Sequence, residues 1–241
     1  MGRLVCQQTR SEGVTNTGNI RSHNEDAFIN LDQQQLWAVA DGMGGHQSGE
    51  VASRMIVDAL ATYRATPLLG KNIRQITSLL QAVNQQLVEL ADNDADKIIG
   101  STIAILLLHG RYCAALWAGD SRVYRYRKGL LKQITRDHSE AELLRDAGIT
   151  PEEISNLPYA ESITRAVGAD TFLQLEAQIQ EIQAGDIYLL CSDGLYKELD
   201  ETDMAQIMSA NDIKTSIQQL LATALKRQGR DNITIVVIEI Q

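Results

Sequence analysis

Four aspartates stand at the ends of apolar runs in this 241-residue sequence. Asp41 follows LWAVA, Asp120 follows CAALWAG, Asp193 follows IYLLCS, and Asp231 lies just before ITIVVIEI. Each run is typical of a buried strand, and neighbouring antiparallel strands share an edge, so we expect these carboxylates to converge at one edge. Asp26, in the segment NEDAF ahead of another expected strand, is expected to be a fifth.

Carboxylates gathered near a core need a positive counter-charge, because an unpaired buried charge is costly. Any one such aspartate is most often a turn residue that ends a strand, and that interpretation stays open for each of them. As a set, oxygen ligands without a neighbouring Cys or His group favour hard cations, Mg²⁺ or Mn²⁺, over zinc. The sequence has no Asp-x-Asp-x-Asp-Gly loop, which excludes an EF-hand.

The glycine-rich segment DGMGGHQSGE at residues 41–50 has two other interpretations that its spacing can test. Gly44 and Gly49 have the separation of a phosphate-binding P-loop, but Glu50 and Val51 stand where Lys and Ser or Thr are required. A dinucleotide-binding loop is also excluded, because a glutamine occupies its third glycine position. The metal interpretation gives Gly42 a use, since a residue without a side chain lets its own carbonyl approach an ion.

Composition bounds the class of protein. The formal net charge of −9 argues against nucleic acid or an anionic membrane as the main partner, because both need clustered Lys and Arg. The start lacks the apolar core of a signal peptide, and no segment approaches the roughly 18 apolar residues of a membrane span. Cys6, Cys113 and Cys191 have no metal-type spacing and are expected to be reduced thiols. We therefore expect a cytoplasmic protein.

The hydrophobic pattern predicts one domain over residues 1–241, with a surface excursion at about 137–167. That excursion is polar, partly helical and without an obvious core-facing side, and Pro151 and Pro158 interrupt it. Gly13 is expected in a turn. Helices are expected at 50–63, 73–90 and 213–227, and strands at 4–9, 27–31, 36–40, 101–109, 112–118, 122–126, 130–134, 173–181, 187–191 and 233–240.

An ordered series of short motifs spans nearly the whole chain. It comprises RSHNEDA at 21–27, DGMGG at 41–45, GST at 100–102, GDSR at 119–122, SDG at 192–194 and DN at 231–232. Each motif alone is weak, but in this order and spacing the set resembles the PP2C-type metal-dependent protein serine/threonine phosphatases. DGMGG is similar to the bacterial branch of that family.

The resemblance implies an α+β fold, a four-layer α-β-β-α sandwich with two central antiparallel sheets flanked by helices. It also implies a two-metal centre of Mn²⁺ or Mg²⁺ at one edge. In that centre Asp41 would bridge both ions, Asp193 and Asp231 would complete the first, and the Gly42 carbonyl would serve the second. The remaining implied ligands are Asp26 and Glu25 at the second ion, directly or through water, and Asp120 with Asp193 at a third, weaker ion.

The activity that the resemblance implies is hydrolysis of phosphoserine and phosphothreonine in proteins by direct attack of a metal-bridging hydroxide, reversing a bacterial serine/threonine kinase. The charges agree with a need for metal. A phosphate ester with nearly two negative charges would be repelled by bare carboxylates, at about 1 to 4 kcal/mol for each charge pair at about 4 Å. The sequence has no Cys-x5-Arg loop for a covalent route.

Other residues have roles that involve the substrate. Arg21 matches the arginine that grips phosphate in the family, and its planar fork suits that task. His46 is the candidate acid for the leaving group, although a metal-bound water could serve instead while His46 orders the loop. Ser139 and Arg165, in the excursion that corresponds to the flap of bacterial members, are candidates for substrate contact.

Two alternatives remain beside the enzyme: a catalytically silent phosphoprotein-binding module, and a related phosphatase dedicated to one phosphoprotein in a regulatory pathway. A silent module would lack a metal carboxylate, and this sequence keeps the four that matter most, Asp26, Asp41, Asp193 and Asp231. A pathway phosphatase usually carries a sensor domain, for which this chain has no room. The expected partners are phosphorylated proteins, including a kinase and its substrates.

Overall fold

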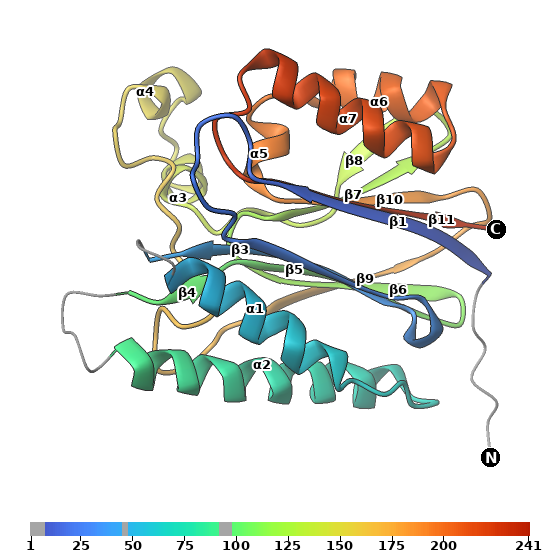
Figure 1. The fold of residues 1–241 in the computed structure, drawn as a ribbon, viewed down its shortest axis with the longest axis horizontal. Helices are drawn as coiled ribbons and strands as arrows, with labels where there is room; N and C mark the ends of the chain where they lie inside the picture. The colour runs from blue at the N-terminus through green and yellow to red at the C-terminus, as the bar shows by residue number, and fades with distance from the viewer. Residues whose placement is uncertain (1–7, 45–47, 92–97) are drawn as a thin grey trace.

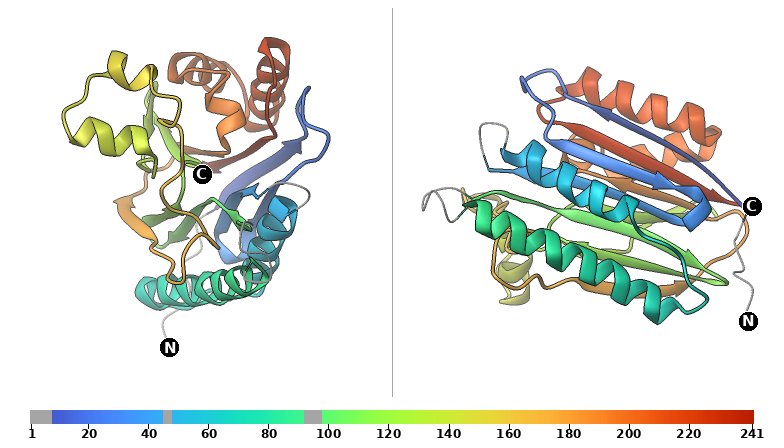
Figure 2. Two further views of the ribbon diagram at one scale, coloured as in Figure 1. Left: turned by 90° about the vertical axis from the view of Figure 1, so that its left-hand side faces the viewer. Right: turned by 60° about the horizontal axis from the view of Figure 1, so that its bottom comes forward.

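The structure is a computed structural model and describes residues 8–44, 48–91 and 98–241. Two antiparallel sheets pack face to face, and helices cover both outer faces (Figure 1). This arrangement confirms the four-layer sandwich that the sequence predicts. The flanking helices α3 (Glu140–Asp146) and α4 (Pro151–Ser155) stand out to one side of the sandwich, as the left view of Figure 2 shows.

The first sheet has the order β2-β3-β5-β6-β9, with the short β4 paired to β3. Its strands are β2 (Asp26–Leu31), β3 (Leu36–Met43), β4 (Gly100–Ser101), β5 (Ile103–His109), β6 (Tyr112–Ala118) and β9 (Glu176–Glu181). The second sheet has the order β1-β11-β10-β7-β8. Its strands are β1 (Thr9–Asn16), β7 (Arg122–Arg127), β8 (Leu130–Gln133), β10 (Ile187–Cys191) and β11 (Ile233–Ile240). A 3-10 turn, η1 (Asp32–Gln34), joins β2 to β3.

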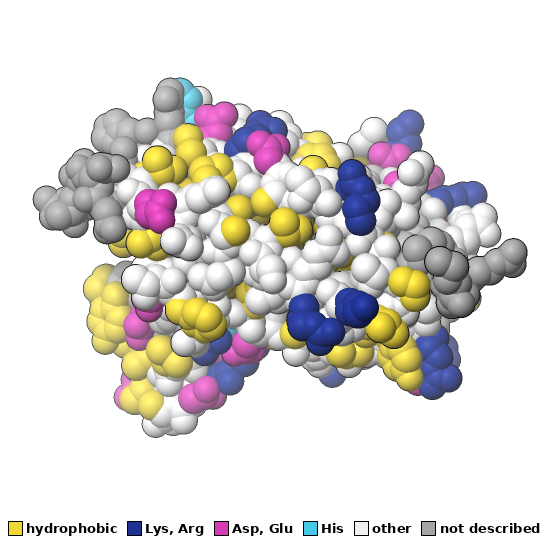
Figure 3. All heavy atoms as spheres, turned by 90° about the horizontal axis from the view of Figure 1, so that it is seen from below, with side chains coloured by type: hydrophobic (Ala, Val, Ile, Leu, Met, Phe, Trp, Pro, Cys, Tyr) yellow, Lys and Arg dark blue, Asp and Glu magenta, His cyan; other side chains and the backbone are white. Residues whose placement is uncertain are grey.

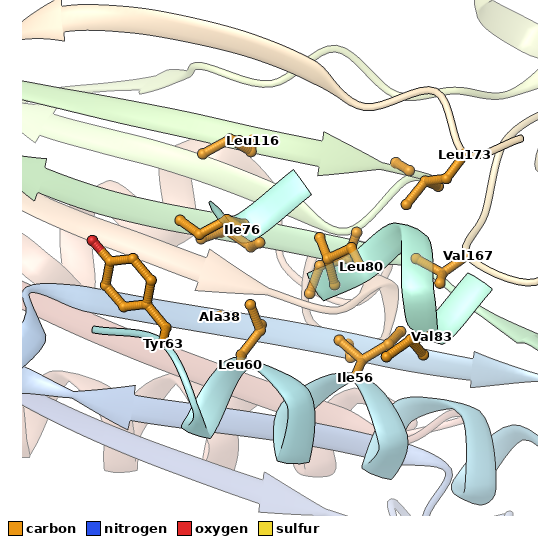
Figure 4. Close-up of a cluster of buried hydrophobic side chains, with 14 of the residues drawn as sticks. Ala38, Ile56, Leu60, Tyr63, Ile76, Leu80, Val83, Leu116, Val167 and Leu173 are labelled. Carbon is orange, nitrogen blue, oxygen red and sulfur yellow. The ribbon is translucent and has the colours of Figure 1, made fainter. Parts of the chain in front are cut away.

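Helices α1 (Ser48–Ala61) and α2 (Leu69–Ala91) cover the first sheet because each carries an apolar stripe at helical spacing. In α2 this stripe contains Ile76, Leu80, Val83 and Leu87, which belong to one buried cluster with side chains of β3 and β5. Figure 4 shows part of this cluster, with Ile76 and Leu80 of α2 and Ala38 of β3. The face that α1 and α2 present outward is mostly uncharged, with Lys and Arg in small groups (Figure 3). That face does not offer the broad basic field that nucleic-acid binding requires.

The second sheet is covered by α5 (Asp193–Tyr196), α6 (Glu201–Ala210) and α7 (Ile213–Arg227). Helix α6 was not predicted from the sequence. Its start is nevertheless marked, because Asp200 forms a capping box with Asp203, and Met204 and Met208 are buried one turn apart. A third cluster of buried side chains fills the space between the two sheets. The inner faces of the sheets therefore pack against each other through a shared core.

The first strand differs from the prediction. The predicted segment 4–9 lies largely outside the described residues, and β1 runs over Thr9–Asn16, with Gly13 inside the strand rather than in a turn. The strand pairs along its whole length with β11. A side chain at Gly13 would collide with the ring of Phe28, only 2.4 Å from an added Cβ, so this glycine makes room for packing between the sheets.

Two other segments also differ. The expected strand 101–109 is divided at Thr102 into β4 and β5. The excursion contains α3 and α4 and contributes to the packing, since Ile154, Ala160 and Val167 are buried. The expectation that it has no core-facing side is therefore wrong.

No helix among the described residues is both long enough and apolar enough to cross a membrane. Cys113 and Cys191 are buried free thiols, as predicted, while Cys6 lies outside the described residues.

Candidate metal centre

The five predicted aspartates come from the ends of strands in both sheets. Asp41 lies near the end of β3, directly opposite Asp26 at the start of β2. Asp120 lies between β6 and β7, Asp193 begins α5 two residues after β10, and Asp231 lies two residues before β11. The charges of the other four aspartates all raise the pKa of Asp41, which shows that the fold brings the five side chains together.

Asp41 has the most acidic surroundings of the group. Its pKa is raised well above the ordinary value, first because its carboxyl is buried and then because of the charges of Asp26 and Asp193. The residue as a whole keeps some exposure to solvent. Two carboxylates directly opposite each other on antiparallel strands repel, so the Asp26–Asp41 pair is unfavourable without a cation.

Asp26 is buried, with 6% of its surface exposed. Burial raises its pKa to about 7, although hydrogen bonds from Thr234 and Ser192 act in the opposite direction. Its Oδ2 accepts a hydrogen bond of 2.7 Å from the Ser192 hydroxyl. Its Oδ1 is buried and has no hydrogen-bond partner among the described residues.

Asp120 has similar surroundings. Burial raises its pKa to about 6, and the charges of Asp193 and Asp137 add to that effect. Its Oδ2 accepts a hydrogen bond of 3.1 Å from the Tyr196 hydroxyl, whereas its buried Oδ1 has no partner in the described part of the chain. A buried carboxylate oxygen without a donor is rare and calls for an ion or water.

Cationic side chains of the protein hold two other carboxylates. Arg21 Nη2 lies 2.8 Å from Asp231 Oδ2, and Lys197 Nζ lies 2.8 Å from Asp193 Oδ2. Over residues 8–44, 48–91 and 98–241, no three acidic, His or Cys side chains are arranged as a ready-made ion-binding group. The donor set nevertheless fits a hard divalent ion, because it consists of oxygens and includes two buried oxygens that no other described residue contacts by a hydrogen bond.

Gly42 lies at a crossing of three backbone segments. Its N–H donates to the Glu25 carbonyl over 3.1 Å, and it pairs with Ser101 of β4. A Cβ at this position would lie 2.1 Å from the Gly49 carbonyl oxygen, at the start of α1. Close backbone packing thus requires glycine here, a reason additional to the predicted approach of its carbonyl to an ion.

Asn232 positions the loop that leads into β2, a role that was not predicted from the sequence. Its Oδ1 accepts from the Glu25 N–H over 2.8 Å, and its Nδ2 donates to the Thr17 and His23 carbonyls, each over 2.9 Å. One buried side chain thus fixes residues 17–25 next to Asp26. The short motif DN contains this signal, because Asn offers both a donor and an acceptor.

His138 is a second residue whose part was missed. It is buried, stacks on Trp117 with ring centroids 5.9 Å apart, and its Nδ1 accepts from the Gly119 N–H over 3.1 Å. The His138 backbone N–H donates to the Gly119 carbonyl in return. These bonds fix the loop that carries Asp120 to the base of the excursion.

The predicted substrate-contacting residues lie in different places. Arg21 lies at the exposed rim of the cluster, beside Asp231. Ser139 lines a cavity that also contains Asp120. Arg165 lines a neighbouring cavity, where it binds Glu176 over 2.9 Å and approaches His138. His46 lies outside the described residues.

Comparison with known proteins agrees with this geometry. A family model described as protein phosphatase 2C matches residues 19–231, a range that includes the whole first sheet and all five aspartates. The chain therefore belongs to the protein phosphatase 2C family and is a protein phosphatase.

Similar proteins include bacterial phosphatases. It is 35% identical over 239 residues to the serine/threonine phosphatase stp of Listeria monocytogenes, covering 95% of each chain. Among solved structures, it is similar to PppA, a regulatory component of T6SS in Pseudomonas aeruginosa, with 36% identity, a TM-score of 0.90 and coverage of 97% and 98%. It is also similar to the catalytic domain of the phosphatase PstP in complex with two manganese ions, with 33% identity, a TM-score of 0.84 and coverage of 96% and 98%.

Proposed function

We propose that this chain hydrolyses phosphoserine and phosphothreonine in proteins with the help of two divalent ions, Mn²⁺ or Mg²⁺. One observation carries the proposal: five carboxylates from distant parts of the chain act on one another at one edge, and two of their buried oxygens have no partner in the described residues. We assign the ions to Asp41 as the shared ligand, Asp193 and Asp231 at one ion, and Asp26, Glu25 and the Gly42 carbonyl at the other.

When bound, divalent ions supply counter-charge for the phosphate and a water of lowered pKa that attacks the phosphorus in line. The protein's own part is to hold the carboxylates in place against their mutual repulsion. Asn232 fixes the chain before Asp26, and Ser192 donates to Asp26 Oδ2. His138 fixes the chain before Asp120.

Arg21 is assigned to the phosphate. Its side chain is 54% exposed and pairs with Asp231, whose side chain is 32% exposed, so solvent reaches both partners. A solvent-exposed ion pair contributes little stability and exchanges readily. With the Asp231 carboxylate engaged in holding an ion, the Arg21 fork would be free to make two charge-assisted bonds to phosphate oxygens.

The wider setting follows from this assignment. We propose that residues 1–241 act as one phosphatase domain, with the excursion at about 137–167 beside the substrate and Ser139 and Arg165 in reach of it. We also propose that the protein works in the cytoplasm, where it reverses phosphorylation by a serine/threonine kinase. A silent binding module is not favoured, because no metal carboxylate is missing. His46 remains the predicted proton donor to the leaving group.

The test is hydrolysis of a phosphothreonine peptide by the full chain with Mn²⁺, with EDTA, and with the variant Asp193→Ala. We expect EDTA to remove activity and Asp193→Ala to lower kcat/KM by at least about a hundredfold, through lost ion binding. Asp58→Ala, an exposed aspartate in α1, is the matched control and should keep full activity. Activity that survives both EDTA and Asp193→Ala would overturn the proposal.

A further inference from the structure

A cavity of about 200 Å³ lies between the excursion and α5, next to the candidate metal centre. Asp120, Tyr196 and Lys197 line it on the side of the metal centre, and Glu161 lines it on the side of the excursion. One of these lining residues, Asp120, has a buried carboxylate oxygen, Oδ1, without a hydrogen-bond partner among the described residues.

Lys197 places a positive charge inside this cavity. Its Nζ lies 2.8 Å from Asp193 Oδ2 and 3.0 Å from Glu161 Oε2, so one ammonium contacts both walls. Asp193 and Lys197 are four residues apart at α5, a spacing that puts an acid and a base on the same helical face. The Lys197 charge also reaches Asp120, whose pKa it lowers against the effect of burial.

This contact is unlike an ordinary surface ion pair. The Asp193 side chain is only 14% exposed and the Lys197 side chain 34%, so water screens the pair less than it does at an open surface. The Tyr196 ring closes the cavity beside it, since its hydroxyl donates to Asp120 Oδ2 and its face stacks against Arg122 at 3.5 Å. The ammonium is thus held beside both aspartates.

We propose that the Lys197 ammonium takes the place of a third metal ion at Asp120 and Asp193, so that this chain binds two divalent ions and supplies the third positive charge itself. The inference rests on the proposed function, which places the first two ions. A carboxylate has two oxygens. Because Asp193 Oδ2 accepts from Lys197, Oδ1 would be the oxygen left to hold an ion. A further divalent ion at this position would be repelled by the ammonium.

The proposal has a second consequence for the excursion. Because the ammonium also contacts Glu161, it links the excursion to α5 without any ion. Removing the lysine charge should therefore do two things at once, namely open a place for another ion and release the excursion. Removing the Glu161 charge should release the excursion alone.

The test counts Mn²⁺ ions per chain by equilibrium dialysis of the full protein at neutral pH. We expect two ions in the wild type, three in Lys197→Met, and two in both Lys197→Arg and Glu161→Gln. Lys214→Met, at an exposed position in α7, is the matched control and should bind two. Limited proteolysis within residues 137–167 should become severalfold faster in Lys197→Met and Glu161→Gln, but not in Lys214→Met.

Three ions in the wild type would overturn the inference alone, and this measurement does not depend on any variant that fails to fold. Two ions in a folded Lys197→Met would overturn it as well, because the lysine would then not be what excludes the third ion. Fewer than two ions in the wild type would overturn the proposed metal centre, and the inference with it. Unchanged proteolysis of Lys197→Met would refute the link to the excursion.

Discussion

Replacing Asp26 by asparagine should stabilise the metal-free protein at alkaline pH and do so less as the pH falls. Burial raises the pKa of Asp26 from 3.8 to about 7, so the folded state holds this proton more tightly than the unfolded chain does. The wild type therefore loses stability as the pH rises from about 4 through about 7, and the full penalty is present above that range. The amide side chain introduced by Asp26→Asn carries no charge at any of these pH values.

The size of the effect follows from that pKa. Moving one carboxyl from 3.8 to about 7 changes the free energy of unfolding by about 4 kcal/mol in total. Of this, about 3 kcal/mol falls between pH 5 and pH 8. The amide can still accept from the Ser192 hydroxyl, and any cost of its extra N–H groups is independent of pH. The difference between the two pH values therefore reports the charge of Asp26 together with its effect on Asp41, whose pKa the Asp26 charge raises.

The assay is urea unfolding in EDTA at pH 5 and pH 8, followed by the fluorescence of Trp37 and Trp117. The stability of Asp26→Asn relative to the wild type should rise by about 3 kcal/mol from pH 5 to pH 8. Asp58→Asn, at an exposed position, should show no such change. Saturating Mn²⁺ at pH 8 should stabilise the wild type more than the variant, because ligands that bind only the folded state add stability. Equal relative stability at both pH values would refute the argument from burial.

Two further substitutions test the backbone supports of the site. Asn232→Ala should lower the free energy of unfolding by about 3 kcal/mol, because it removes three hydrogen bonds. The control Asn156→Ala, at an exposed position, should lower it by less than about 1 kcal/mol. Urea unfolding measures both variants, and a small effect of Asn232→Ala would contradict the role assigned to this residue. Gly42→Ala should lower the free energy of unfolding by about 3 kcal/mol, because the added Cβ would collide with the Gly49 carbonyl. The control is Gly70→Ala, where the atom nearest to the added Cβ is 3.7 Å away. Equal thermal stability of these two variants would be inconsistent with close backbone packing at Gly42.

Much of the site was predictable because strand ends are marked in the sequence. Apolar runs such as LWAVA and IYLLCS are long enough to identify buried strands, and an acidic residue at the end of a run must lie at a sheet edge. The meeting of Asp41, Asp120, Asp193 and Asp231 follows from antiparallel pairing, which brings the end of one strand beside the start of another. The helices α1, α2 and α7 were predicted for a similar reason, since their apolar residues repeat at helical spacing.

What the sequence did not predict depends on contacts between distant residues. Gly13 lies in a strand that pairs with β11, and Phe28 leaves no room there for a side chain; no local pattern around Gly13 records either neighbour. His138 contacts Gly119, and Lys197 contacts Glu161, over separations that spacing rules do not reach. Helix α6 was missed although its capping box is visible in the sequence, because its apolar stripe is short.

The Ser192 hydroxyl joins the two sheets at the edge where the aspartates meet. It donates to Asp26 in the first sheet and accepts from the Thr234 N–H in the second. Some of the carboxylates belong to the first sheet and some to the second. The spacing between them therefore depends on how the two sheets pack against the buried side chains that separate them. Val236 and Leu106 lie in that buried cluster, and they therefore help to set the spacing between the aspartates from a distance. Divalent ions held by carboxylates of both sheets would link the two layers at this edge. The affinity for these ions would therefore depend on how well the side chains between the sheets pack.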